Sequence, residues 1–145
     1  MKSSGSKRCL IASLLISLSC IISCGHDTTL SIKDDRFPSF EVRGGGYELF
    51  FSVSEVTEEK DRFGKKEVPV WSFKSKERSA HKTWPTIVYG ELSGEFEQTF
   101  PHQTKPLPLV EGKLYGVHAT IYSTSGDSLW FVVKDGKAVE VSKPN

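Results

Sequence analysis

The chain has 145 residues, of which 37% are hydrophobic and 26% charged, and its formal net charge is +1. The length suggests one domain, and the composition is that of a globular protein rather than a disordered one. Positions 1–23 hold three basic residues and no acidic one, so residues 24–145 carry 16 basic against 18 acidic side chains. A nearly neutral domain has no bulk electrostatic attraction for nucleic acid, which argues against a nucleic-acid partner.

The first 23 residues have the three-part layout of a secretory signal peptide. A basic segment, MKSSGSKR, precedes the apolar segment CLIASLLISLSCII, and small residues follow. The alternative is a transmembrane anchor, but the uncharged run from Cys9 to Gly25 has only 17 residues, four of them serine. That is the lower limit of the roughly 17–25 residues that span a bilayer. A buried core helix fits less well, because the run is terminal and has no polar face.

The residues IISCGH at positions 21–26 resemble the lipobox of bacterial lipoproteins, in which an aliphatic residue stands three before the cysteine and a small one directly before it. The resemblance implies cleavage before Cys24 and lipid on its thiol. Cys20 competes for this role, but it would place Ser17 where the aliphatic residue belongs. Gly25 is not the aspartate that retains such proteins in the inner membrane of enteric bacteria, so the resemblance implies the outer membrane, facing the periplasm.

With Cys24 lipidated, the mature chain has no free thiol, because Cys9 and Cys20 leave with the signal peptide. It then has no disulfide and no cysteine-based metal site, and its stability comes from packing alone. Residues 24–36 are mostly polar, and we expect them to form a lipidated tether that lets a domain of residues 37–145 stand off the membrane.

From Phe37 onward, short apolar runs alternate with turn residues, and no segment sustains helical periodicity over ten residues. This pattern is typical of an all-β domain. Three glycines at 44–46 suit a turn or bulge. The next run, YELFFSVSEV (47–56), predicts a strand with Tyr47, Leu49, Phe51 and Val53 on one face. VPVWSFKS (68–75) and TIVYGEL (86–92) are further candidates, and Pro69 favours an edge position for the former.

Two later runs alternate clearly. KLYGVHATIYS (113–123) predicts a strand with Tyr115, Val117, Ala119 and Ile121 on one face, and SLWFVVK (128–134) groups Leu129, Phe131 and Val133. TSGD before Ser128 predicts a hairpin turn, and so does Asp135-Gly136 before the last strand, AVEVS. Six or seven strands predict a two-layer antiparallel β-sandwich of immunoglobulin or fibronectin type III style, with a small β-barrel as the alternative.

The segment YGELSGEFEQTFPHQTKPLPLVEGKLYGV (89–117) resembles a pattern in small uncharacterised proteobacterial lipoproteins. Ser93 and Glu95 stand where that pattern has proline and glycine. The resemblance implies a sandwich fold and no known activity. The matching residues are Tyr89, Gly90, Phe96, Gln98, Pro101, Pro106, Pro108, Leu109, Gly112 and Tyr115.

No pattern of catalytic or metal-ligating residues emerges from the sequence. The four histidines, at positions 26, 81, 102 and 118, lie more than four residues apart, and there is no G-x-S-x-G, phosphate loop or calcium loop. His118 is out of phase with Tyr115 and Val117, so we expect it on the opposite strand face. A hydrolase would require His102 or His118 beside a carboxylate in a pocket. We expect no enzyme, no cofactor and no metal.

Two features suggest binding. Residues 60–82 hold eight Lys or Arg against three acids, a cluster that suits an anionic envelope surface or an acidic partner. The alternative is that these charges keep a hairpin soluble and block edge pairing. Trp84, before Pro85, is either an exposed recognition aromatic or, with Trp71 and Trp130, part of the core. The candidate binding residues are Lys65, Lys66, Lys74, Lys76, Arg78 and Trp84.

These features predict a non-enzymatic, lipid-anchored binding or accessory module with a membrane contact through Cys24 and an envelope protein as partner. The alternative is a periplasmic immunity or inhibitor lipoprotein that neutralises a toxin or hydrolase, with a partner complementary in charge to residues 60–82. The hydrolase is the third hypothesis.

Overall fold

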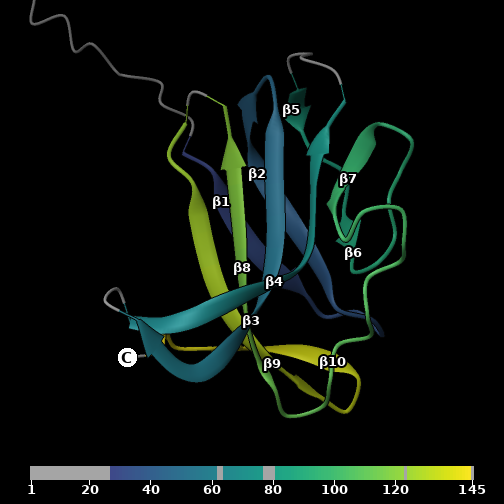
Figure 1. The fold of residues 1–145 in the computed structure, drawn as a ribbon. Helices are drawn as coiled ribbons and strands as arrows, with labels where there is room; N and C mark the ends of the chain where they lie inside the picture. Colours follow the sequence, from purple (N-terminus) through teal and green to yellow (C-terminus); the bar gives the residue numbers. More distant parts are fainter. Residues whose placement is uncertain (1–26, 62–63, 77–80, 123, 145) are drawn as a thin grey trace, which may run out of the picture.

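Two antiparallel sheets pack face to face in the computed structural model, which describes residues 27–61, 64–76, 81–122 and 124–144 (Figure 1). One sheet holds β2 at its centre, with β1 on one side and both β5 and β6 on the other. The other has the order β10-β9-β8-β3-β4-β7. The strands are β1 (Thr29–Lys33), β2 (Ser39–Gly46), β3 (Leu49–Asp61), β4 (Gly64–Ser75), β5 (His81–Thr83), β6 (Ile87–Val88), β7 (Phe96–Phe100), β8 (Leu114–Ile121), β9 (Asp127–Lys134) and β10 (Lys137–Val141).

The predicted sandwich is confirmed, and the barrel alternative is wrong, because no described strand joins the two sheets into a closed ring. The strand order is that of an immunoglobulin-type domain. The order β1-β2-β5 corresponds to strands A, B and E, and β9-β8-β3-β4 corresponds to G, F, C and C′. The strands β10 and β7 extend the larger sheet at its two edges.

The core lies between the sheets and is rich in aromatic rings. Phe40 of β2 inserts between Phe51 of β3 and Phe131 of β9, with ring centroids 5.6 and 5.5 Å away. The inward faces predicted for β8 and β9 are confirmed, since all of their predicted core residues are buried. In β3 the prediction holds for Leu49, Phe51 and Val53, but Tyr47 is 53% exposed because it precedes the strand and lies at the end of the sandwich.

The first strand, β1, comes from a segment that we expected to be tether. It pairs with β2 along its whole length, from Thr29 opposite Arg43 to Lys33 opposite Ser39. Its two apolar residues, Leu30 and Ile32, pack against the core. The alternation in TLSIK was present in the sequence, but the polar character of the surrounding residues concealed it. The folded domain therefore includes Thr29–Lys33 and does not begin at Phe37.

Several other local predictions are settled by strand pairing. Pro69 lies where β4 pairs only with β3, so its edge position is confirmed, while the later half of β4 pairs with β7 as well. The segment 86–92 contributes only the two residues of β6. Gly44 has φ of 138° beside a register shift in β2, as a bulge requires. Asp135 and Gly136, with φ of 52° and 75°, form the predicted two-residue hairpin turn.

The sandwich has two distinct ends, at the top and bottom of Figure 1. At the tether end, where the described chain begins, the Thr28 and Thr124 hydroxyls share a 2.6 Å hydrogen bond and the Thr28 amide donates to the Ser125 carbonyl. At the distal end, the β1–β2 turn meets the β9–β10 turn through a 2.9 Å ion pair between Asp34 and Lys137.

Candidate functional site

A cavity at the distal end of the sandwich is the candidate site, and we call it the distal cleft. It encloses about 520 Å³, within the roughly 300–1,000 Å³ typical of ligand sites. Four segments that are far apart in the sequence form it: the entry to β2, β6 with the chain after it, the long connection from β7 to β8, and the β9–β10 hairpin. Its lining residues are Phe37, Pro38, Val88, Tyr89, Gly90, Glu91, Lys105, Pro108, Leu109, Glu111, Val133 and Gly136.

Tyr89 forms the wall that joins the cleft to the core. Its ring packs edge-on against Trp71 with centroids 5.2 Å apart, and its hydroxyl donates a 2.8 Å hydrogen bond to the Leu107 carbonyl. Burial, with a smaller contribution from the nearby Tyr115, raises the pKa of Tyr89 to about 12. The phenol therefore stays protonated at neutral pH and keeps its hydrogen bond.

The β7–β8 connection is held in place by side chains from the sheet. The Gln98 amide nitrogen donates to the Pro101 and Thr104 carbonyls at 2.5 and 2.6 Å, while its oxygen accepts from the indole nitrogen of the buried Trp71 at 3.1 Å. Farther along, the Tyr115 hydroxyl accepts a 2.9 Å hydrogen bond from the Val110 amide. These contacts make the wall of the cleft preformed.

Apolar surface and a few charges surround the opening of the cleft. Phe37, Leu107 and Val110 are 63%, 80% and 49% exposed, so three large apolar side chains lie at this end of the molecule. Glu111 is engaged by the β9–β10 turn, since its carboxylate accepts from the Asp135 amide at 2.7 Å. Glu91 and Lys105 are both exposed at the cleft. The cleft thus combines apolar walls with one charged group of each sign free to orient a ligand.

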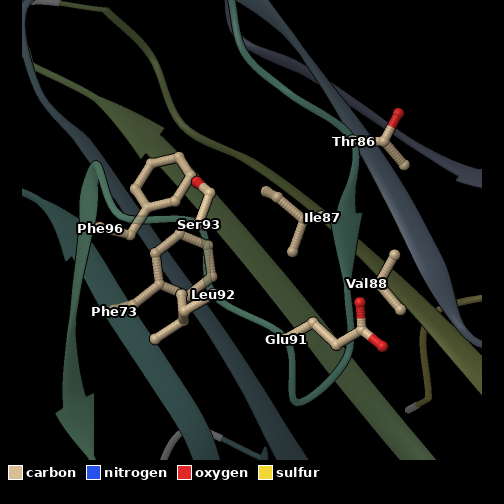
Figure 2. A pocket seen from close by; sticks show the side chains of 8 residues that line it. All are labelled: Phe73, Thr86, Ile87, Val88, Glu91, Leu92, Ser93 and Phe96. Atoms are coloured by element: carbon tan, nitrogen blue, oxygen red, sulfur yellow. The ribbon is translucent and has the colours of Figure 1, made fainter.

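A second, smaller cavity opens where the edge of one sheet faces the edge of the other (Figure 2). It encloses about 280 Å³, and Figure 2 shows Thr86, Ile87 and Val88 on one side with Phe73, Leu92 and Phe96 on the other. Val88 and Glu91 line both cavities, so residues 88–91 form the partition between them. The Phe73 and Phe96 rings, 4.8 Å apart, belong to the core, and this pocket is a shallow seam beside the distal cleft.

Most residues that carry the resemblance in segment 89–117 lie in or support the distal cleft, whereas Phe96 lies in the core at the smaller cavity. Besides Tyr89, Gln98 and Tyr115, whose bonds are given above, Gly90 adopts φ of 78° and lies against Pro106, from which a Cβ at this glycine would be 3.5 Å. Gly112, with φ of 75°, donates to the Val133 carbonyl at 2.9 Å. Gly90 and Gly112 thus belong to the scaffold of this cleft.

His118 lies on the outer face of the larger sheet, as expected, and the structure brings it to a carboxylate. Its Nε2 lies 2.6 Å from Glu67 Oε2, and its Nδ1 lies 2.8 Å from the Ser128 hydroxyl. Because an ionised carboxylate only accepts, Nε2 donates to Glu67 and, in neutral histidine, Nδ1 accepts from Ser128. Sequence reasoning did not predict Glu67 or Ser128, which are 51 and 10 residues away from His118.

Ser128, His118 and Glu67 are the residue types of a catalytic triad, in which an acid and a histidine activate a nucleophile. The groups around them differ from those of such an active site. A shallow groove beside His118 is lined by Phe50 and hydroxyl residues of the neighbouring strands. The Ser128 amide, the natural candidate to stabilise an oxyanion, donates instead to Asp127 Oδ1 at 2.8 Å. Neighbouring amides lie in the β8–β9 ladder, since His118 and Ser128 are register partners. Without free donors, an acyl-transfer transition state would lack its main stabilisation.

The candidate basic residues do not form one surface. Lys65 and Lys66 lie near the start of β4 at the distal end, and Lys66 pairs with Glu59 at 2.9 Å. Lys74 and Lys76 lie at the other end of the strand, about 30 Å away at 3.3 Å per residue. Lys76 donates to the Gly94 carbonyl at 2.8 Å. The described lysines of this segment are therefore spread along the extended strand, and the binding of an acidic partner or an anionic surface by residues 60–82 stays a prediction.

The other predicted site residues fall in the core or outside the described chain. Trp84 is only 6% exposed and belongs to the core, so it is not an exposed recognition aromatic. Trp71 is also in the core, whereas Trp130 lies on the outer face, 6.2 Å from His118 and beneath Lys143. Cys24, the predicted lipidation site, and Arg78 lie outside the described residues.

Neither a metal site nor a relative adds to this description. Within residues 27–61, 64–76, 81–122 and 124–144, no three His, Cys, Asp or Glu side chains are grouped to hold a metal ion, and no helix is long and apolar enough to cross a membrane. Comparison of the chain with protein-family models, curated proteins and solved structures found no match.

Proposed function

We propose that this chain is a lipid-anchored, non-enzymatic binding module of the bacterial cell envelope, held by acyl chains on Cys24, that binds an extended segment of a partner protein in the distal cleft. The observation that carries the proposal is the preformed distal cleft beside three exposed apolar side chains, Phe37, Leu107 and Val110. Exposed apolar groups that gather at one end of a small domain are characteristic of interaction surfaces.

The chemistry of the cleft favours a peptide. Proline and aromatic side chains line it, which suits an extended segment with apolar anchors. Glu91 and Lys105 are exposed on its rim and offer opposite charges that would fix the direction of such a segment. The alternative is an immunity or inhibitor lipoprotein whose partner is complementary in charge to residues 60–82, and the spread of the described lysines along β4 gives that alternative less support than the cleft gives the first.

The membrane attachment is supported by the lipobox resemblance around Cys24. Two or more acyl chains give stable anchoring, because each buried CH₂ contributes about 0.8 kcal/mol. An outer-membrane location facing the periplasm is part of the proposal. Anchoring concentrates the module near partners in the same membrane, so that modest intrinsic affinity suffices.

The test places a photo-crosslinking amino acid in the lipidated full-length protein at Phe37, beside the cleft, and separately at Val139 on the outer face of β10 as a matched control. Both side chains are exposed, at 63% and 43%. After irradiation of intact cells, we expect one discrete protein adduct from position 37 and none from position 139. Equal adducts from both positions, or none from position 37, would contradict the proposal.

Two variants separate the cleft from the anchor. Leu107→Ser, which changes an 80% exposed side chain beside the cleft, is expected to weaken the adduct while leaving the protein folded and lipidated. Cys24→Ser is expected to release the protein from the membrane fraction. If the Cys24→Ser protein stays in the membrane fraction, the lipid anchor is refuted but the binding role of the distal cleft is not.

A further inference from the structure

The distance between the predicted lipid and the folded domain is short. With β1 beginning at Thr29, and Thr28 buried and bonded to Thr124, only three residues separate Cys24 from the fixed chain at Thr28. Four residue steps span at most about 14 Å, whereas a tether ending at Phe37 would have reached about 45 Å. The domain therefore cannot stand far from the lipid surface, and the end of the sandwich that carries Thr28 is the one that faces the membrane.

That end carries exposed aromatic side chains. Tyr47 and Tyr122 are 53% and 51% exposed, and the Tyr122 amide donates to the Glu48 carbonyl at 2.8 Å, which places the two tyrosines on neighbouring segments. The start of the described chain lies at the same end, because Gly44, three residues before Tyr47, lies against both the Asp27 carbonyl and Thr28. Tyrosine is enriched at membrane–water interfaces, where its ring is buried among headgroups and its hydroxyl stays hydrated.

We infer that the tether end is a membrane-docking surface, and that Tyr47 and Tyr122 enter the headgroup region of the bilayer that holds Cys24. The inference rests on the proposed function, since it requires the lipid on Cys24. The described charges at this end include both signs: Asp27, Glu48 and Asp127 are acidic, and Arg43 and Lys76 are basic. Docking therefore depends on the tyrosines and the short tether, and not on electrostatic attraction, so it is insensitive to salt.

Docking in this orientation directs the distal cleft away from the membrane. Strand β9 runs between the two ends, and its eight residues span about 26 Å. The cleft is then held roughly that far above the headgroups, open to the aqueous compartment. A partner that reaches the cleft need not approach the bilayer.

The experiment uses the full-length lipidated protein in vesicles of phosphatidylethanolamine and phosphatidylglycerol. A polarity-sensitive fluorophore is attached through Arg43→Cys at the tether end or through Leu107→Cys at the distal end. We expect the emission at position 43 to shift to shorter wavelength, to rise, and to be quenched by headgroup-labelled lipids, at low and high salt alike. The emission at position 107 is expected to remain that of a label in water.

Variants measured with the position 43 reporter test the tyrosines. Tyr47→Ser with Tyr122→Ser is expected to abolish most of the shift, while the control pair Phe37→Ser with Leu107→Ser retains it; unchanged melting temperatures confirm that both pairs fold. A water-like spectrum at position 43, with lipid on Cys24 verified by mass spectrometry, would overturn the docking and leave the proposed function intact. A mass spectrum without lipid on Cys24 would overturn both.

Discussion

The hydroxyl of Tyr115, at the start of β8, accepts a 2.9 Å hydrogen bond from the backbone amide of Val110, five residues earlier. Immunoglobulin-type sandwiches contain a corresponding tyrosine near the start of strand F, whose hydroxyl bonds the backbone just upstream. Here the Tyr115 ring is buried and stacks on Phe131 at 5.4 Å. One side chain thus joins the core of the larger sheet to the loop that lines the distal cleft.

Replacing Tyr115 with Phe keeps this stacking and removes only the hydroxyl. We expect the free energy of unfolding in urea to fall by about 1 kcal/mol, since the Val110 amide loses its partner but lies close enough to solvent to find water. The exposed Tyr47→Phe is the control and is expected to change it by less than about 0.5 kcal/mol. An equal loss in both variants would argue against a specific role for the hydrogen bond between the Tyr115 hydroxyl and the Val110 amide.

Trp84→Ala tests whether this residue stabilises the core or recognises a ligand. With 6% exposure and a position in the core cluster, its removal should cost about 3–5 kcal/mol of unfolding free energy. Phe37→Ala, at a side chain 63% exposed, should stay within about 0.5 kcal/mol. Urea denaturation of both variants measures this, and similar stabilities would contradict the core assignment.

The Glu67 carboxylate that pairs with His118 packs closely against Gly116. A Cβ at Gly116 would lie 3.2 Å from both carboxylate oxygens of Glu67. A double-mutant cycle with Glu67→Ala and His118→Ala should give a coupling of about 0.5–1 kcal/mol, because both side chains are about one-third exposed. Repeated in Gly116→Ala, the coupling should fall, because the Glu67 carboxylate must shift by a few tenths of an ångström away from the new Cβ. An unchanged coupling would show that the carboxylate reaches His118 by another route.

Tyr89 makes the stability of the folded domain depend on pH in alkaline solution. Its folded pKa of about 12 exceeds the ordinary value of 10.0, so the stabilisation it provides is complete below pH 10 and is lost as the pH rises towards 12. The reason is that the unfolded chain releases this proton first. Phenolate absorbance should show a step near pH 12 that Tyr89→Phe lacks. The same step in the variant would assign it to another group.

The alternation of apolar and polar residues in the sequence identified the strands that have one buried face and one exposed face. In β8 and β9 every second residue is buried against the other sheet, so the hydrophobic period alone indicates strand, face and connecting turn. The short strands β5, β6 and β7 have two to five residues and no such pattern of sufficient length. They are strands because a longer neighbour pairs with them, and that neighbour is distant in sequence.

The sequence by itself determined the sandwich, the inward faces of β3, β8 and β9, and the Asp135-Gly136 turn, because these depend on local periodicity and local backbone preference. Only the tertiary structure decided that Glu67 meets His118, that Tyr89 meets Leu107, and that the lysines of β4 lie at opposite ends of the molecule. Such contacts depend on strand register and on the paths of loops, which are fixed by packing between segments far apart in the chain.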